Sequence, residues 1–245
     1  MATFGFIGTG NMGGALARAV CRRVPSDEVF LANRTMEKAQ ALAAELGALL
    51  GLAPGAPALV VGLGNRSLTA DAVGPLALPH ILVTRHMLQA MPEEFAGFSS
   101  VAALTTGVLA ETGLESFELI AAVAEKLQPR CVIVLDALAA AGREKLCAVL
   151  QITDTGLTPG SGVGNHRREV SQKTLGVPVL ALGLPTVIQA DPLIGEEAPA
   201  EGEALFVTPR DIDQRVRELS RLMAYGIDLA LQPHLTVDDI TGLLG

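Results

Sequence analysis

Aromatic residues are scarce in this chain of 245 residues: they make up 3% of it, with no Trp and a single Tyr, Tyr225. Proteins that hold single-stranded nucleic acid stack its bases on aromatic rings, so a surface of that kind is excluded. Basic residues are also few, because 18 Lys and Arg stand against 26 Asp and Glu, for a net charge of −8. A chain with this balance does not hold a phosphate backbone by charge, and we expect no direct nucleic-acid partner.

Cysteine and histidine motifs are equally sparse. The three cysteines, Cys21, Cys131 and Cys147, are far apart and form no CxxC pair, so neither a disulfide framework nor a zinc site is supported. The four histidines show no HExxH pattern, and we expect no metal. No apolar run approaches the roughly 18 residues of a membrane span, and the N-terminus lacks the basic region of a signal peptide. A soluble cytoplasmic protein without a membrane partner is the expectation.

What the chain has in abundance is apolar sequence: hydrophobic residues make up 49%, enough for a sizeable core. Several apolar runs lack clean alternation, as strands do when both faces of a mainly parallel sheet are buried. Strands are expected at residues 3–7, 29–32, 58–61, 81–83, 101–104, 132–135 and 177–182. Helices are expected at residues 15–23, 35–50, 114–127 and 211–231. This alternation predicts an α/β fold, with helices flanking a mainly parallel sheet.

A stretch rich in Pro and Gly interrupts this pattern at residues 51–57, and it predicts a linker. We therefore expect two units. Residues 1–50 would form a partial, Rossmann-like βαβα segment, and residues 58–245 a separate α/β domain.

The N-terminal segment carries a glycine loop between an expected strand and an expected helix. Strand, GxGxxG and helix form the dinucleotide fingerprint, in which the backbone approaches a pyrophosphate at a helix N-terminus. The second strand ends on Arg and Thr rather than an acidic residue, which favours NADP over NAD. The candidate cofactor-binding residues are Gly8, Gly10, Asn11, Met12, Gly13, Asn33, Arg34 and Thr35.

These residues also carry a family resemblance. The sequence FGFIGTGNMGGALARAV, followed by LANRTMEKAQALAAELGA, resembles the start of pyrroline-5-carboxylate reductase over residues 1–48. The resemblance implies an NADP-binding oxidoreductase. The alternative is an appendage that binds no cofactor, because the match stops before a third strand.

Two aspartates stand at the ends of apolar runs. Asp136 ends the run that starts at Cys131, and Asp71 follows the expected strand at residues 58–61. In an open α/β sheet, sites form at the carboxyl ends of the strands. Two carboxyl groups that meet there share a proton, so that one activates water as a base while the other polarises a carbonyl as an acid. The alternative for each aspartate is the N-cap of a following helix.

Other polar candidates lie in turns. Asp154 begins a triplet, Asp-Thr-Gly, that leads into a glycine-rich loop, and it either serves catalysis or holds that loop by hydrogen bonds. Backbone N–H groups of this loop could bind an oxyanion or an extended substrate. The accessory or substrate-loop candidates are Asn65, His86, Asp154, Ser161 and Gly162. Three basic residues, Arg167, Arg168 and Lys173, indicate a solvated face or a contact for acidic substrate residues.

A second resemblance covers residues 50–245 through several motifs in order. The segments VVGLGNRSLTADAVGP, VIVLDALAA, LQITDTGLTPGSGVGNHRREV and VTPRDIDQRVRELSRLMAYGIDLAL resemble the germination protease family of spore endopeptidases. The resemblance implies a fold related to hydrogenase-maturation peptidases and an aspartic-type mechanism that needs no cofactor. The catalytic aspartates of the family correspond to Asp71 in TADAVGP and Asp136 in LDALAA.

The same resemblance implies a biological setting. The substrates would be small acid-soluble spore proteins, the location the spore core or forespore, and the assembly a homo-oligomer. The family starts with a long arm that contains a pro-segment; here the reductase-like segment stands in its place, so zymogen control is expected to be absent or changed. The rival hypotheses are the NADP-dependent oxidoreductase and a catalytically inactive protein of the protease fold.

Overall fold

A computed structural model describes residues 4–7, 29–32, 35–53, 55–160, 167–190 and 205–244. The strands are β1 (Phe4–Ile7), β2 (Val29–Ala32), β3 (Ala58–Leu63), β4 (Val101–Gly107), β5 (Cys131–Ala139), β6 (Gln151–Thr153), β7 (Val179–Gln189) and β8 (Phe206–Val207). The α-helices are α2 (Thr35–Leu50), α3 (Val73–Ala77), α4 (Arg85–Ala90), α5 (Leu109–Thr112), α6 (Ser116–Leu127), α7 (Gln172–Leu175), α9 (Ile212–Leu231) and α10 (Val237–Leu244). Short 3₁₀ turns are η2 (Thr69–Asp71), η3 (Leu78–His80) and η4 (Arg143–Lys145).

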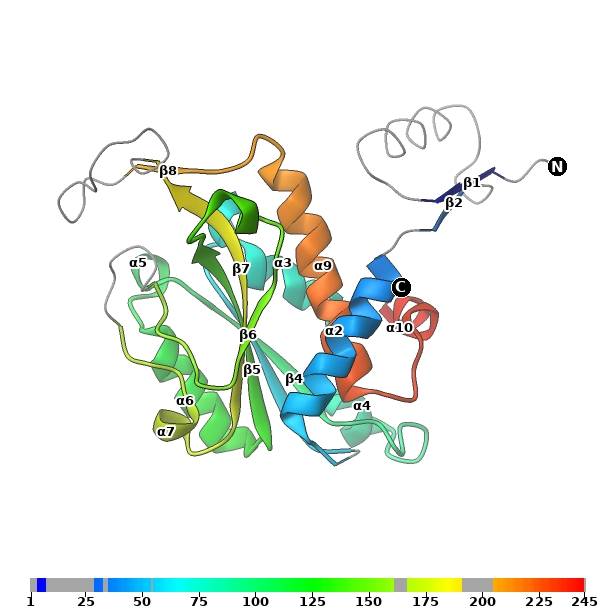
Figure 1. The fold of residues 1–245 in the computed structure, drawn as a ribbon. Coiled ribbons are helices and arrows are strands. Elements are labelled where there is room, and N and C mark those ends of the chain that lie inside the picture. Colours follow the sequence, from blue (N-terminus) through cyan, green and yellow to red (C-terminus); the bar gives the residue numbers. More distant parts are fainter. Residues whose placement is uncertain are drawn as a thin grey trace.

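The largest element is a six-stranded sheet with the order β4-β3-β5-β7-β6, in which β8 pairs with the end of β7 (Figure 1). Strands β4, β3, β5 and β7 are parallel, whereas β6 and β8 run antiparallel to β7. The expected fold class, an α/β protein with a mainly parallel sheet flanked by helices, is therefore confirmed. Strands β1 and β2 pair in parallel in a separate two-stranded sheet.

Helices cover both faces of the six-stranded sheet, because alternate residues of the buried strands face opposite sides. On one face, Val60 and Ile133 pack in a cluster with α2, α3 and α9. On the other face, Val61 and Val134 pack with Phe117 and the rest of the apolar side of α6. The result is a three-layer arrangement, with the strands in the middle (Figure 1).

Most of the expected elements form, but the strand expected at residues 81–83 does not. The backbone N–H of Leu82 donates instead to both carboxylate oxygens of Asp228 in α9, at 3.0 and 3.1 Å. This apolar run is buried without joining the sheet, because a helix side chain takes the place of a neighbouring strand as its acceptor. Burial raises the pKa of Asp228 well above its ordinary value.

A second helix side chain pairs with backbone in the same manner. The side-chain amide of Gln232, just past α9, accepts from the N–H of Ser99 at 2.8 Å and donates to its carbonyl at 2.9 Å. Both residues are buried, and the two bonds satisfy polar groups that would otherwise be costly to bury. They fasten the end of α9 to the segment that leads into β4.

Helix α2 packs as part of the main core. Its buried residues Leu42 and Leu46 belong to the same cluster as β3, β5 and α9, and Leu42 lies directly against Gly226 of α9. The Pro- and Gly-rich stretch at residues 51–57 therefore does not separate α2 from the core, because this helix covers α9 on its outer side. None of the helices in the described part of the chain combines the length and the apolar character that a membrane crossing needs.

Two leucines of α2 test whether this helix stabilises the core. The side chain of Leu46 is fully buried, whereas that of Leu49 is 49% exposed. We expect Leu46→Ala to lower the free energy of unfolding by about 2–5 kcal/mol, because it leaves a cavity between α2 and the sheet. The matched control Leu49→Ala should change it by less than about 0.5 kcal/mol. Urea denaturation followed by circular dichroism measures both, and equal values for the two variants would contradict this packing.

Candidate functional site

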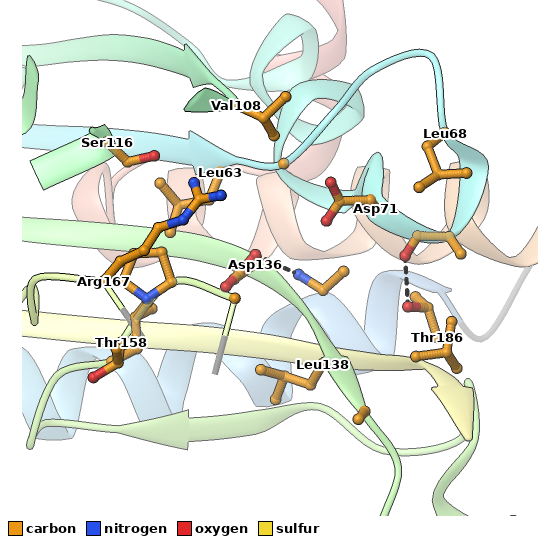
Figure 2. Close-up of a pocket in the computed structure, with 18 of the residues that line it drawn as sticks. Leu63, Leu68, Asp71, Val108, Ser116, Asp136, Leu138, Thr158, Arg167 and Thr186 are labelled. Atoms are coloured by element: carbon orange, nitrogen blue, oxygen red, sulfur yellow. Dashed lines mark hydrogen bonds between the residues drawn. The ribbon is translucent and has the colours of Figure 1, made fainter. Parts of the chain in front are cut away.

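A cavity of about 290 Å³ lies at the carboxyl ends of the parallel strands (Figure 2). Strand β3 contributes its last residue, Leu63, and β4 contributes Gly107. The last four residues of β5, from Asp136 to Ala139, line the cavity together with Thr186 and Val187 of β7. In open α/β sheets this edge is where ligands bind.

Asp71 is held at the cavity by a tight turn after β3. Its Oδ2 atom accepts a hydrogen bond of 2.8 Å from the backbone N–H of Asn65, which closes the loop between β3 and η2. Gly64 has a positive φ of 108°, and a Cβ atom placed on it would lie 1.9 Å from the carbonyl oxygen of Asp71. Only glycine fits this position. On the other side of the turn, the Thr186 hydroxyl donates to the carbonyl of Ala70 at 2.6 Å.

The strand before this turn and the helix after it are in direct backbone contact. A Cβ atom on Gly74 of α3 would lie 2.5 Å from the backbone nitrogen of Leu63, and one on Gly62 would lie 2.7 Å from the carbonyl of Gly74. The two glycines allow α3 to pack against β3 without an intervening side chain. The loop that carries Asp71 therefore starts and ends on rigid elements.

Asp136 is positioned by β5, in the centre of the sheet. The pairing of β5 with β3 ends at Leu135, opposite Gly62, whereas its pairing with β7 continues through Asp136 and beyond. Asp136 is therefore the first residue of β5 past the end of its pairing with β3, at the point where the cavity begins. Its side chain is 7% exposed, and its Oδ1 atom accepts from the N–H of Ala137 at 2.9 Å.

The structure contradicts the N-cap alternative for both aspartates. The residue that precedes α3 is Ala72, which makes no side-chain cap, and the Asp71 carboxylate bonds backwards to Asn65 instead. Asp136 precedes no helix, because β5 continues to Ala139. Figure 2 shows both carboxyl groups directed into the same cavity.

The cavity raises the pKa of both carboxyl groups. Burial, reinforced by the negative charge of Asp71, raises the pKa of Asp136 to about 7 against the opposing effect of the Ala137 N–H. Burial also raises the pKa of Asp71, and the charge of Glu111 adds to this effect; the Asn65 N–H and the charge of Arg167 act against it. Below about pH 7, the more buried Asp136 therefore holds a proton.

The rest of the cavity wall is mainly apolar. The apolar side chains that line it are Leu63, Leu68, Val108, Leu138, Leu157, Pro159 and Val187. Besides the aspartates, the described polar side chains that line it are those of Ser116, Thr158, Arg167 and Thr186 (Figure 2). Ser116 is buried at the start of α6 and accepts a hydrogen bond from Thr106 at 3.2 Å.

The other candidates from the sequence divide into three groups. Asn65 lies at the site, where its backbone orients Asp71 and its side chain accepts from the N–H of Ser67. His86, in α4, and Asp154, after β6, are exposed and are not among the described residues that line the cavity. Ser161 and Gly162 lie outside the described residues.

Most of the predicted nucleotide site also lies outside the residues that the structure describes. Gly8, Gly10, Asn11, Met12, Gly13, Asn33 and Arg34 all lie outside the described residues, and Thr35 is the first residue of α2. NADP binding therefore stays a prediction. Within the described ranges, no group of three or more His, Cys, Asp and Glu side chains is arranged to hold a metal ion.

Two residues of the site were not recognised from the sequence in their present roles. Arg167 was interpreted as part of a basic patch, but it lines the cavity beside the aspartates. Gly64 was not singled out from the sequence, whereas its missing side chain makes room for Asp71. The signal for Arg167 is its place directly after the glycine-rich loop, although spacing alone does not say which way a loop residue points.

Comparisons with known proteins agree on one family. A sequence model described as germination protease matches residues 31–198. A germination protease from Clostridium perfringens (strain ATCC 13124) is 34% identical, and the match covers 95% of this chain and 83% of that relative. One from Priestia megaterium is 37% identical, over 92% of this chain and 62% of the relative.

Among solved structures, the hydrogenase (NiFe) maturation protease HycI from Thermococcus kodakarensis KOD1 is 20% identical to this chain, with a TM-score of 0.41. The match covers 74% of this chain and 98% of that protein. The family itself is shown by the sequence matches, which span the turn that carries Asp71, the strand that carries Asp136 and most of the remaining sheet. This chain belongs to the germination protease family.

Proposed function

We propose that this protease is an aspartic-type endopeptidase in which Asp71 and Asp136 together activate water. The observation that carries the proposal is the shared cavity: two carboxyl groups, from a turn and from a central strand, line one apolar space, in which the charge of Asp71 raises the affinity of Asp136 for a proton. Two neighbouring carboxyl groups that hold one proton supply a base and an acid at the same time.

The surroundings favour a division of roles between them. Asp136 is the more buried group, and its raised pKa makes it the proton donor near neutral pH. Asp71 is half-buried and accepts the Asn65 N–H, which stabilises its charged form, so it is the base. Both groups are held by rigid elements, as efficient catalysis requires.

The reaction follows from these roles. A water molecule between the carboxyl groups gives a proton to Asp71 while its oxygen attacks the carbonyl carbon of the peptide. Asp136 transfers its proton to the carbonyl oxygen, so that no free oxyanion forms. Asp71 then gives its proton to the leaving nitrogen as the C–N bond breaks. The hydroxyl of the intermediate returns a proton to Asp136, and the pair is restored.

Family membership supports the proposal for the substrate and its setting. We propose small acid-soluble spore proteins as substrates, inside the spore core, with the enzyme in a homo-oligomer. The apolar wall formed by Leu63, Leu138 and Val187 suits an extended polypeptide rather than a small polar molecule. Digestion of a small acid-soluble spore protein, followed by intact-mass spectrometry, tests the substrate class directly.

The two aspartates are tested by isosteric substitution. Asp71→Asn removes the base and Asp136→Asn removes the transferable proton, so each should lower kcat at least about 100-fold. Asp154→Asn is the matched control, because Asp154 is exposed and lies outside the cavity wall, and it should retain activity. Cleavage of a spore protein at an unchanged rate by either cavity variant would contradict the mechanism.

Burial of Asp136 also predicts how stability depends on pH. Because the pKa of Asp136 is raised from 3.8 to about 7 in the folded protein, the folded state binds a proton at this group more tightly than the unfolded chain does. The resulting stability is complete below the unfolded pKa and is lost as pH rises through about 7. Asn does not ionise, so the Asp136→Asn variant does not lose this stability. The free energy of unfolding of the variant, minus that of the unsubstituted protein, should therefore rise by about 1–3 kcal/mol between pH 5 and pH 8.

Urea denaturation at the two pH values measures this difference. Asp154→Asn serves again as the control, because Asp154 is exposed and lies outside the cavity wall. A difference for Asp136→Asn that stays constant between pH 5 and pH 8 would show that Asp136 is ionised in the folded protein at both pH values.

A further inference from the structure

We propose that Arg167 is a positioning residue of the aspartate pair, whose guanidinium keeps Asp71 charged so that the shared proton resides on Asp136. This inference rests on the proposed aspartic mechanism, and it adds a positive charge to the two features that already distinguish the carboxyl groups, the deeper burial of Asp136 and the Asn65 N–H on Asp71.

The geometry places one positive charge where this role requires it. The Arg167 side chain extends into the cavity towards the two carboxyl groups (Figure 2). It is the one cation among the described residues that line the cavity. In an apolar cavity a charge acts over a longer distance than in water, since solvent screens it less. A guanidinium group stays charged at every pH at which the enzyme is active.

The segment that carries Arg167 is anchored by a backbone bridge. Val170 and Leu157 exchange backbone hydrogen bonds of 3.0 and 2.8 Å, which join this segment to residues 157–160 of the cavity wall. The next guanidinium, that of Arg168, lies 4.0 Å from the centre of the Phe117 ring in α6. Arg167 therefore starts from a held backbone, and its side chain is directed inwards while that of Arg168 is directed outwards.

The charged and titratable groups that face Asp71 come from several elements. Arg167 lowers the pKa of Asp71, and Glu111 of α5 raises it; Asp136 of β5 faces it across the cavity. From α9, Asp213 accepts a hydrogen bond from Thr69 in the same turn, at 2.8 Å. The charge of Arg167 is thus opposed by that of Glu111, and its removal should favour protonation of Asp71.

The proposal makes a prediction about the pH profile of kcat/KM. The acid limb reports protonation of Asp71, and the basic limb reports loss of the proton from Asp136. Arg167→Gln should move the acid limb to higher pH, with roughly threefold or greater loss of kcat/KM at pH 5 and a much smaller loss at pH 7. Arg167→Lys, which keeps the charge, should restore the position of the limb. Glu111→Gln should move it in the opposite direction.

Arg168→Gln is the matched control for changes to this segment, because its guanidinium packs outside the cavity, and it should leave the limb unmoved. An unmoved acid limb in Arg167→Gln would overturn the proposal. A rise in KM with an unchanged profile would also overturn it, since Arg167 would then bind substrate instead. Neither result bears on the aspartates, whose role is contradicted only if Asp71→Asn or Asp136→Asn remains active.

Discussion

The main constraint on the site is the unfavourable free energy of placing two negative charges in one apolar cavity. Removal from water disfavours the charged form of each carboxyl group, and the nearness of the other adds repulsion. The pair avoids most of this cost by retaining one proton, which is held on Asp136 at the centre of the sheet. The proposed mechanism uses the same proton, because a base and an acid then face the same substrate atoms.

The fold brings these groups together through its strand order. Strand β5 lies between β3 and β7, and its pairing with β3 stops one residue before Asp136. The turn after β3 folds back over this gap, where Gly64 allows the backbone of Asp71 to approach. Both arrangements are made by backbone packing and not by flexible side chains. The backbone therefore fixes the position of the two carboxyl groups relative to each other. Arg167 then enters the cavity from a segment that is bridged to Leu157 of the cavity wall.

The sequence predicted strands β3, β5 and β7 well because they are buried on both faces, which leaves a continuous apolar signal, whereas the more exposed β6 and β8 were not predicted. It predicted that Asp71 and Asp136 meet, because both follow apolar runs whose carboxyl ends lie at the same edge. The run at residues 81–83 was wrongly predicted as a strand, since a hydrogen bond from a distant helix residue, Asp228, carries no local signal. The direction of the Arg167 side chain was missed for the same reason: it is set by long-range packing.

Helix α2 shows that long-range packing, which leaves no local sequence signal, also limits the prediction of domain boundaries. Pro and Gly after residue 50 indicated a linker, and the glycine loop before the helix suggested a separate unit. In the structure, Leu42 and Leu46 pack into the main core, and the germination protease match begins at residue 31. Local composition marks where a chain turns, but only the distribution of buried side chains shows which unit a helix belongs to.

A titration of the two carboxyl groups by ¹³C NMR measures the central claim directly. Aspartate labelled at the side-chain carboxyl carbon, with signals assigned from the Asp71→Asn and Asp136→Asn variants, follows each group between pH 3 and pH 9. The account predicts that the Asp136 signal titrates near pH 7 while Asp71 is already ionised at lower pH. Two signals that both titrate at the ordinary pKa of an exposed aspartate, about 3.9, would contradict it, because the carboxyl groups would then hold no common proton.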